Sequence, residues 1–230
     1  MGYVSFRGVS TEALGVFIAK GGMPSHVKAK TRATEYEIPG RNGAVHVIDG
    51  YSPFDLIVTL QLMRNDAHTR QLINAWADGT GELFSSDDTQ RVWQATVIRA
   101  VEYKRAEYGG AFYDTAKVVF RCQPFMRERV PEVVELTAAG TLRNIGNVEA
   151  LPQVVVHGSG DCTVTIGTET IRLEGVDGSV TIDSETGYVY SAEGAVAMEG
   201  EFPVLGLGDT AVSFDGGVTK VQITPRWGWI

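Results

Sequence analysis

The first residues whose types could support chemistry are His157, Ser159 and Asp161, which lie within the five-residue string HGSGD. Neighbours in sequence cannot normally bring their functional atoms into the geometry of a catalytic triad. The glycine pattern that surrounds a nucleophilic serine is also incomplete, because His and Asp stand at its two outer positions. We therefore interpret this string as a surface turn.

Two pairs of carboxylates are a second candidate for hydrolytic chemistry. Asp87 and Asp88 are adjacent, and Asp183 and Glu185 are two positions apart. A glycosidase needs two carboxyl groups several ångströms apart across a sugar-binding cleft, whereas adjacent acids beside Ser and Thr often form turn hydrogen bonds. We expect no enzymatic activity. A hydrolase that uses these residues is the third hypothesis, and it requires two of them to converge in one cleft.

Motifs for cofactors and metals are weak. Residues 206–211 (GLGDTA) fit the dinucleotide pattern G-x-G-x-x-A, but a strand-like segment follows them where a helix is required. The four histidines are scattered, without the spacing of a metal site. Cys122 and Cys162 fall at inward positions of two strand patterns, so two buried thiols are expected. The sequence predicts no cofactor and no metal.

A small basic strip consists of Lys28, Lys30 and Arg32, in a stretch with little apolar pattern. Such a strip could touch nucleic acid, but the chain has a pI near 5.0 and lacks the charge of a dedicated nucleic-acid binder. An arm or hairpin that contacts an acidic protein surface is the preferred interpretation.

Four aromatic residues could stack on a sugar: Trp227, Trp229, Tyr188 and Tyr190. Exposed aromatic rings present a flat apolar face, whereas tryptophans in a terminal strand usually anchor that strand to its sheet. The anchor is preferred for the two tryptophans. A carbohydrate-binding β-sandwich that attaches to bacterial wall polymers is the alternative function, and it requires at least one of the four rings to be exposed.

The composition is that of a globular chain, with 43% hydrophobic and 21% charged residues among 230, which excludes disorder, collagen and coiled coil. No apolar run approaches the roughly 20 residues that span a bilayer, and no export signal is visible, so synthesis in a cytoplasm without membrane insertion is expected. Residues 1–130 carry 16 Lys and Arg against 14 Asp and Glu, whereas residues 131–230 carry 4 against 14. We expect two domains with these bounds.

Alternation of period two predicts a mainly β chain. Two inward sets are expected in the first domain and several in the second: Leu56, Val58, Leu60 and Leu62; Ala116, Val118, Phe120 and Cys122; then Cys162/Val164/Ile166, Ile171/Leu173, Val180/Ile182, Val212/Phe214 and Val221/Ile223. Turns are expected at residues 167–168, 177–178, 185–187 and 215–217, so short strands about ten residues apart predict an antiparallel sandwich.

One amphipathic helix is expected near residues 66–78. Asn65 is the expected cap, Asp66 suits the positive end of the helix dipole, and Gly79 suits the left-handed position after the helix. An inward face is expected from residues at the four-then-three spacing: His68, Leu72, Ala75 and Trp76.

Several short strings occur in an order that resembles a known family. They are residues 38–43 (IPGRNG), 81–88 (GELFSSDD), 120–124 (FRCQP), 144–152 (NIGNVEALP) and 158–161 (GSGD). The series covers essentially the whole chain, and it resembles the distal tail (Dit) proteins of long-tailed bacteriophages and prophages.

The resemblance implies an N-terminal β-sandwich or split-barrel-like domain with one helix, which forms a hexameric ring, and a C-terminal galectin-like β-sandwich. It implies a structural hub at the virion tail tip that joins the tail tube and tape-measure protein to a tail-associated lysin or receptor-binding protein. The sugar-reading H-x-N-x-R pattern of galectins is absent, so "galectin-like" refers to the fold alone.

Overall fold

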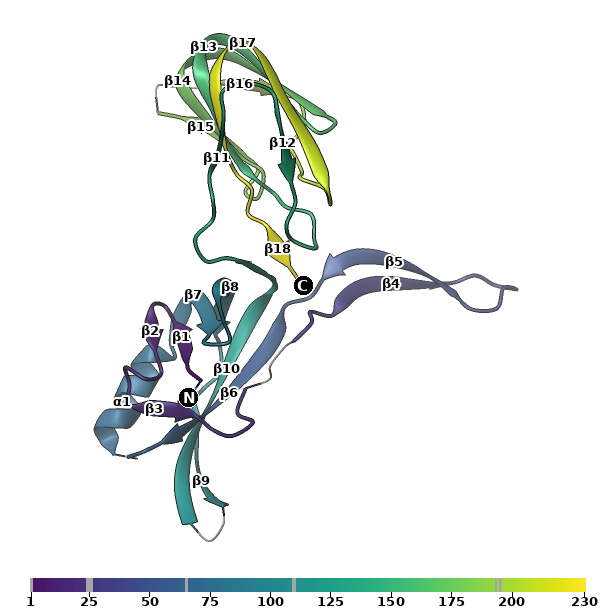
Figure 1. Ribbon diagram of the computed structural model, residues 1–230. Coiled ribbons are helices and arrows are strands. Elements are labelled where there is room, and N and C mark those ends of the chain that lie inside the picture. The colour runs from purple at the N-terminus through teal and green to yellow at the C-terminus, as the bar shows by residue number, and fades with distance from the viewer. Residues whose placement is uncertain (1, 24–26, 65, 109–110, 193, 195) are drawn as a thin grey trace. The chain divides into compact units, whose positions relative to one another are not determined.

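The computed structural model describes residues 2–230 except 24–26, 65, 109–110, 193 and 195. The chain forms two compact units, one of Met1–Met126 with Ile230 and one of Arg127–Trp229. Nearly all regular structure in the described residues is β-strand, with a single helix (Figure 1). The prediction of a mainly β chain with one helix is confirmed.

The first unit is built on an antiparallel sheet with the strand order β2-β1-β7-β8-β10-β6-β3, to which β9 adds by pairing with β10. The bounds are β1 (Val4–Phe6), β2 (Val9–Ser10), β3 (Val16–Ile18), β6 (Phe54–Leu62), β7 (Gly79–Ser85), β8 (Asp88–Val97), β9 (Glu102–Tyr108) and β10 (Ala111–Glu128). Val58 of β6 lies opposite Val118 of β10, and both expected inward sets of these strands are buried. The alternation therefore identified the core face of the central strands correctly.

Helix α1 (Ala67–Trp76) connects β6 to β7. The side chain of Asp66 accepts a hydrogen bond of 2.7 Å from the backbone N–H of Thr69, so Asp66 is the N-cap in place of the expected Asn65, which lies outside the described residues. Gly79 does adopt the left-handed conformation, with φ of 78°, but as the first residue of β7.

The helix face that packs against the sheet differs from the expected one. Ile73 and Trp76 are buried, whereas His68, Leu72 and Ala75 are exposed. The Trp76 ring meets Phe6 and Phe120 edge-on, at centroid distances of 6.1 and 5.6 Å, and its indole N–H donates to the carbonyl of Val9 at 2.9 Å. Because the contacts of Trp76 fix the rotation of the helix, Ile73, three residues before Trp76, faces the core and Leu72 does not.

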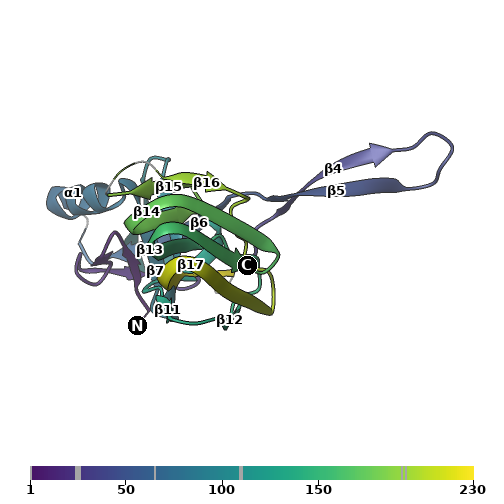
Figure 2. The same ribbon diagram turned by 90° about the horizontal axis from the view of Figure 1, so that it is seen from above.

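A separate two-stranded ribbon, β4 (Thr31–Glu37) and β5 (Ala44–Tyr51), extends away from the sheet of the first unit (Figure 2). We call it the arm. At its base the Tyr51 ring packs edge-on against Phe125 at 5.3 Å, and the N–H of Ser52 donates to the carbonyl of Lys30. The arm is thus tied to the unit at one end only.

The second unit is a seven-stranded antiparallel sheet with the order β11-β17-β13-β14-β15, to which β12 adds on β17 and β16 on β14. The bounds are β11 (Val134–Leu136), β12 (Gly140–Arg143), β13 (Gln153–Ile166), β14 (Glu169–Asp183), β15 (Tyr188–Ser191), β16 (Ala197–Glu199) and β17 (Asp209–Thr224), followed by the short β18 (Gly228–Trp229). The three long strands β13, β14 and β17 therefore form the centre of this sheet, and the shorter strands pair with β14 or β17.

Two expected turns are wrong. Residues 177–178 and 215–217 lie inside β14 and β17, which bend there and continue, whereas residues 167–168 and 185–187 are turns as expected. The bend of β13 lies at the same level, because Gly158 is opposite Gly178 and Cys162 is opposite Gly216. The strand halves on both sides of the bends contribute to one core, so the sheet curls over itself.

The bend brings backbones so close that side chains are excluded at certain positions. A Cβ atom at Gly217 would overlap the carbonyl oxygen of Ser159, and one at Gly158 would overlap the carbonyl oxygen of Gly217. Glycine is required at this crossing because only a residue without a Cβ permits the approach.

We expect Gly217→Ala to lower the free energy of unfolding of the second unit by about 2 kcal/mol or more, since the rigid backbone of Ser159 must move to admit a methyl group. Gly206→Ala is the matched control, because a Cβ there meets nothing within 4 Å. Urea unfolding of the three proteins is the measurement. Equal stability of both variants would contradict the close approach.

Candidate functional site

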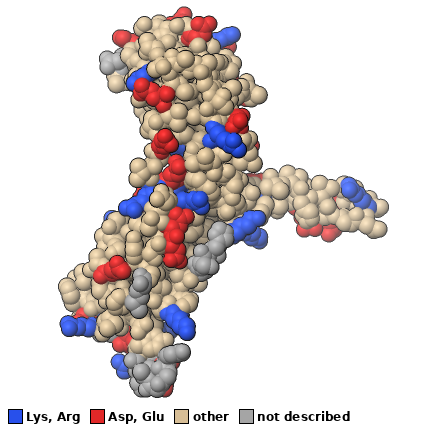
Figure 3. Space-filling view, in the orientation of Figure 1, with Lys and Arg blue, Asp and Glu red and all other residues tan. Residues whose placement is uncertain are grey.

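The arm is the first surface that suits recognition. Its strands pair so that Tyr36 lies opposite Val45 and Thr34 lies opposite Val47, which places these four side chains on one face. Tyr36, Val45 and Val47 are 55%, 37% and 46% exposed. A contiguous row of exposed apolar side chains on a thin ribbon indicates a contact surface, and Figure 3 shows a largely uncharged surface along the visible face of the arm.

An arm or hairpin was expected in this region, but the residues expected to make its contact were the basic ones, Lys28, Lys30 and Arg32. Lys28 and Lys30 are exposed and precede β4. Arg32 lies within β4, where its guanidinium donates a hydrogen bond of 2.7 Å to the carbonyl of Asp49 and so braces the ribbon. The apolar face was missed, although its signal was present in the alternation of Val45 and Val47 after the turn-forming residues 39–43.

The four candidate aromatic residues have separated into two groups. Trp227 is 6% exposed and belongs to the core of the second unit, and Trp229 packs partly buried against that core. A buried ring cannot stack on a sugar, so Trp227 is removed from the stacking candidates, and its burial agrees with the anchor role preferred for it. Tyr188 and Tyr190, at alternate positions of the edge strand β15, are 69% and 53% exposed.

The carboxylates do not form a hydrolytic pair. Asp87 and Asp88 belong to the β7–β8 turn, where Asp88 accepts backbone hydrogen bonds from Gln90 and Arg91, each at 3.1 Å. Asp183 and Glu185 belong to the β14–β15 turn of the other unit and are engaged by arginines. The requirement that two acids converge in an open cleft is not met, which removes the hydrolase hypothesis for these residues.

Asp183 is the centre of a charged cluster at the β14–β15 turn. Its two carboxylate oxygens accept hydrogen bonds of 2.7 and 2.9 Å from the Arg226 guanidinium, and Oδ1 also accepts from the backbone N–H groups of Glu185 and Thr186. Glu185 contacts Arg226 at 3.3 Å and Arg127 at 3.1 Å, and Arg127 also donates to the carbonyl of Arg226. This cluster holds Arg226 in the left-handed conformation, with φ of 59°.

The hydrogen bonds from Arg226 lower the pKa of Asp183 from its ordinary value of 3.8 to about 2, despite the opposing effect of burial. The carboxyl group is therefore ionised at all physiological pH values and cannot serve as a general acid. Its role is structural: it ties the chain before Trp227 to the β14–β15 turn.

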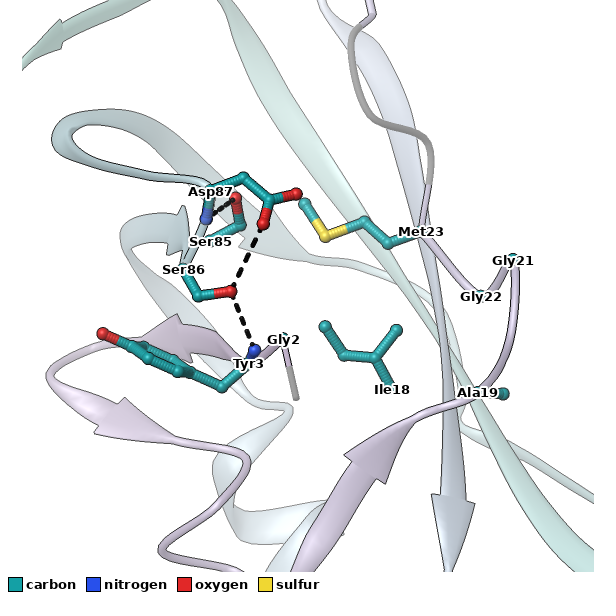
Figure 4. Close-up of a pocket in the computed structure, with 10 residues that line it drawn as sticks. All are labelled: Gly2, Tyr3, Ile18, Ala19, Gly21, Gly22, Met23, Ser85, Ser86 and Asp87. Atoms are coloured by element: carbon teal, nitrogen blue, oxygen red, sulfur yellow. Dashed lines mark hydrogen bonds between the residues drawn. The ribbon is translucent and has the colours of Figure 1, made fainter.

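A pocket of about 310 Å³ in the first unit lies between the N-terminal segment, the end of β3 and the β7–β8 turn (Figure 4). Ser86 Oγ accepts a hydrogen bond of 3.1 Å from the N–H of Tyr3 and lies 3.5 Å from a carboxylate oxygen of Asp87. Ile18 and Met23 supply apolar walls. The pocket brings together no set of residues that would form a reaction centre.

Within the described ranges, no group of three or more His, Cys, Asp and Glu is arranged to hold a metal ion. His46, His68 and His157 lie on β5, α1 and β13, and His26 lies outside the described residues. Cys122 and Cys162 are free and buried, as expected. The described helix has ten residues and falls short of the length that crosses a bilayer.

No family model matches the sequence, and no curated protein is significantly similar to it. The fold of the chain, two β units with one helix in the first, is similar to that of a phage distal tail protein. The solved structure that carries this comparison is the Dit protein (gp 19.1) of phage SPP1, described as a paradigm of the hub adsorption apparatus in phages that infect Gram-positive bacteria. It superposes with a TM-score of 0.77 over 100% of both chains at 12% sequence identity.

A structure of the phage p2 baseplate is also similar, with a TM-score of 0.49, 8% identity and 97% coverage of both chains. The SPP1 comparison confirms the expected resemblance to Dit proteins at the level of the fold, since the sequence identity is 12%.

The Asp183 cluster predicts an acid-dependent loss of stability. Because the folded pKa lies below the unfolded one, the stabilisation is fully present above about pH 4 and is lost as pH falls through about 2. Asp183→Asn should lower the free energy of unfolding by about 2 kcal/mol at pH 7, and this difference from wild type should shrink toward pH 2.

Urea unfolding at several pH values measures the difference, and Asp209→Asn, at an exposed position of the same unit, is the control. A difference that stays constant from pH 7 to pH 2 would show that the ion pair with Arg226 does not cause it.

Proposed function

We propose that the chain is a structural distal tail protein of a long-tailed phage or prophage. It assembles at the virion tail tip, after synthesis in the host cytoplasm, as a hexameric ring. The ring is the hub that connects the tail tube and the tape-measure protein to a tail-associated lysin or receptor-binding protein. The role is mechanical and non-enzymatic.

The observation that carries this proposal is the match to SPP1 Dit over the full length of both chains. A shared fold does not by itself define a function. Here the match extends over both β units, because it covers 100% of this chain.

The arm supports self-association. An isolated two-stranded ribbon is at best marginally stable in water, and in the described structure β4 pairs only with β5. A second copy of the chain is the occupant we propose for the face formed by Tyr36, Val45 and Val47, because a ring must join each subunit to the next by the same contact. Lys28, Lys30 and Arg32, at the base of the arm, are proposed to extend that contact to acidic groups.

The charge distribution supports a division of labour between the two sequence halves. Residues 1–130 are close to neutral, whereas residues 131–230 carry ten more acidic than basic residues. Subunit interfaces are depleted of charge in their core, and strong like charge keeps surfaces apart. The first unit is therefore proposed as the ring-forming half, and the second as a solvated outer lobe.

The proposal predicts that the purified chain forms a ring. Light scattering should give a mass near six times the 24.9 kDa of one chain, and negative-stain images should show rings with sixfold symmetry. A monomer at the highest soluble concentration, both alone and mixed with tail tube protein, would overturn the hub proposal.

Val47→Glu should weaken this assembly, because it places a charge in the proposed apolar contact. We expect the concentration at half-assembly to rise at least about tenfold, as a loss of about 1.4 kcal/mol requires. Val204→Glu is the matched control, since Val204 is 40% exposed in the second unit and Val47 is 46% exposed. Sedimentation velocity is the measurement, and equal assembly of the two variants would exclude the arm face from the interface.

A further inference from the structure

One face of the second unit is a polar surface with an aromatic edge. In the layer β11-β17-β13-β14-β15, alternate residues such as Val154, Ile182 and Ile223 point into the core. The residues between them point outward and lie in register across all five strands. One such row consists of Tyr190, Thr181, Val155, Gln222 and Glu135. We call this surface the outer face.

The polar side chains of the outer face are already linked to one another. Gln222 donates to Glu135 at 2.9 Å and contacts the His157 imidazole at 2.8 Å, and the ammonium group of Lys220 donates to Glu135 at 3.0 Å. Lys220 and Gln222 thereby lower the pKa of Glu135. Amide, imidazole, carboxylate and ammonium groups are thus held in place before any ligand arrives, which reduces the entropy lost on binding.

The two tyrosines border this polar area. Tyr190 is 53% exposed, yet its hydroxyl accepts a hydrogen bond of 3.2 Å from the side-chain amide of Gln153, which lies on β13, two strands away from β15. Neighbouring strands are about 4.8 Å apart, so the Tyr190 ring must incline across the sheet to reach that amide. Tyr188, on the same side of β15, is 69% exposed.

We infer that the outer face binds a pyranose glycan, with Tyr190 as the stacking platform and Gln153 among the groups that bind sugar hydroxyls. A pyranose ring has an apolar C–H face, which suits an exposed tyrosine, and a rim of hydroxyls that both donate and accept, as Gln and His side chains do. The core of a protein–protein interface would need contiguous apolar area, and Val155 is the single aliphatic residue of the described row.

The source we assign to the glycan is a bacterial wall polysaccharide. The matched fold belongs to an adsorption apparatus of phages that infect Gram-positive bacteria, and those cells display such polymers. This site goes beyond the hub role and is independent of ring formation, because its residues all belong to the second unit.

Saturation-transfer NMR on the full chain tests the site. The probes are the methyl glycosides of glucose, galactose, N-acetylglucosamine, N-acetylgalactosamine and rhamnose, together with a protein-free wall polysaccharide from a Gram-positive bacterium. At least one probe should receive saturation. Tyr190→Ala should weaken its binding at least about tenfold, whereas Tyr190→Phe, which keeps the ring, should weaken it less.

Leu207→Ala is the control, because Leu207 is 66% exposed in the same unit and lies outside the outer face. Binding that Tyr190→Ala and Leu207→Ala weaken equally would overturn the assignment. Absence of saturation in every probe would also overturn it, as would binding of a tail protein to the outer face with no glycan bound. Rings that form normally in Tyr190→Ala keep this result separate from the hub proposal.

Discussion

The second unit depends on a constraint that acts on three strands at once. β13, β14 and β17 are neighbours that remain paired on both sides of their bends, so no strand can bend unless the others bend at the same level. Glycines meet at that level, with Gly158 opposite Gly178 and a Cβ excluded at Gly217 by the Ser159 carbonyl. The curl produced there closes one core between the two strand halves, and it leaves the outer face on the layer that carries β15.

The first unit combines two differently packed parts, a body with an aromatic core and an extended arm. Trp76, Phe6 and Phe120 meet edge-on in the core, and the indole hydrogen bond to Val9 fixes the helix against the sheet. Among the described residues, none of the arm's strands belongs to this core, and the base of the arm is held by the contact of Tyr51 with Phe125. A well-packed body and an under-packed ribbon in one unit are what a subunit requires if it completes its packing on its neighbours.

The sequence identified the aromatic residues that were candidates for binding, but it could not tell which of them are exposed. Tyr188 and Tyr190 were selected together with Trp227, and no sequence pattern separates an exposed aromatic from a buried one. Position in the fold makes that distinction: β15 is an edge strand, whereas Trp227 follows the arginine that Asp183 holds. In the arm, the basic residues attracted notice because charge is visible in a sequence, whereas Tyr36, Val45 and Val47 resembled ordinary inward residues until the ribbon proved to have no core beneath it.

The sequence by itself determined the strand alternation, the presence of one helix near residues 66–78, the contrast in charge between the two halves and the ordered strings that resemble distal tail proteins. These are local or additive properties, which a linear chain displays directly. The tertiary structure decided that residues 177–178 and 215–217 are bends inside strands and that Ile73 and not Leu72 faces the core. It also decided that Asp183 accepts hydrogen bonds from Arg226. Each of these depends on a partner far away in the chain, and a glycine or a carboxylate carries no sign of its partner until folding brings the two together.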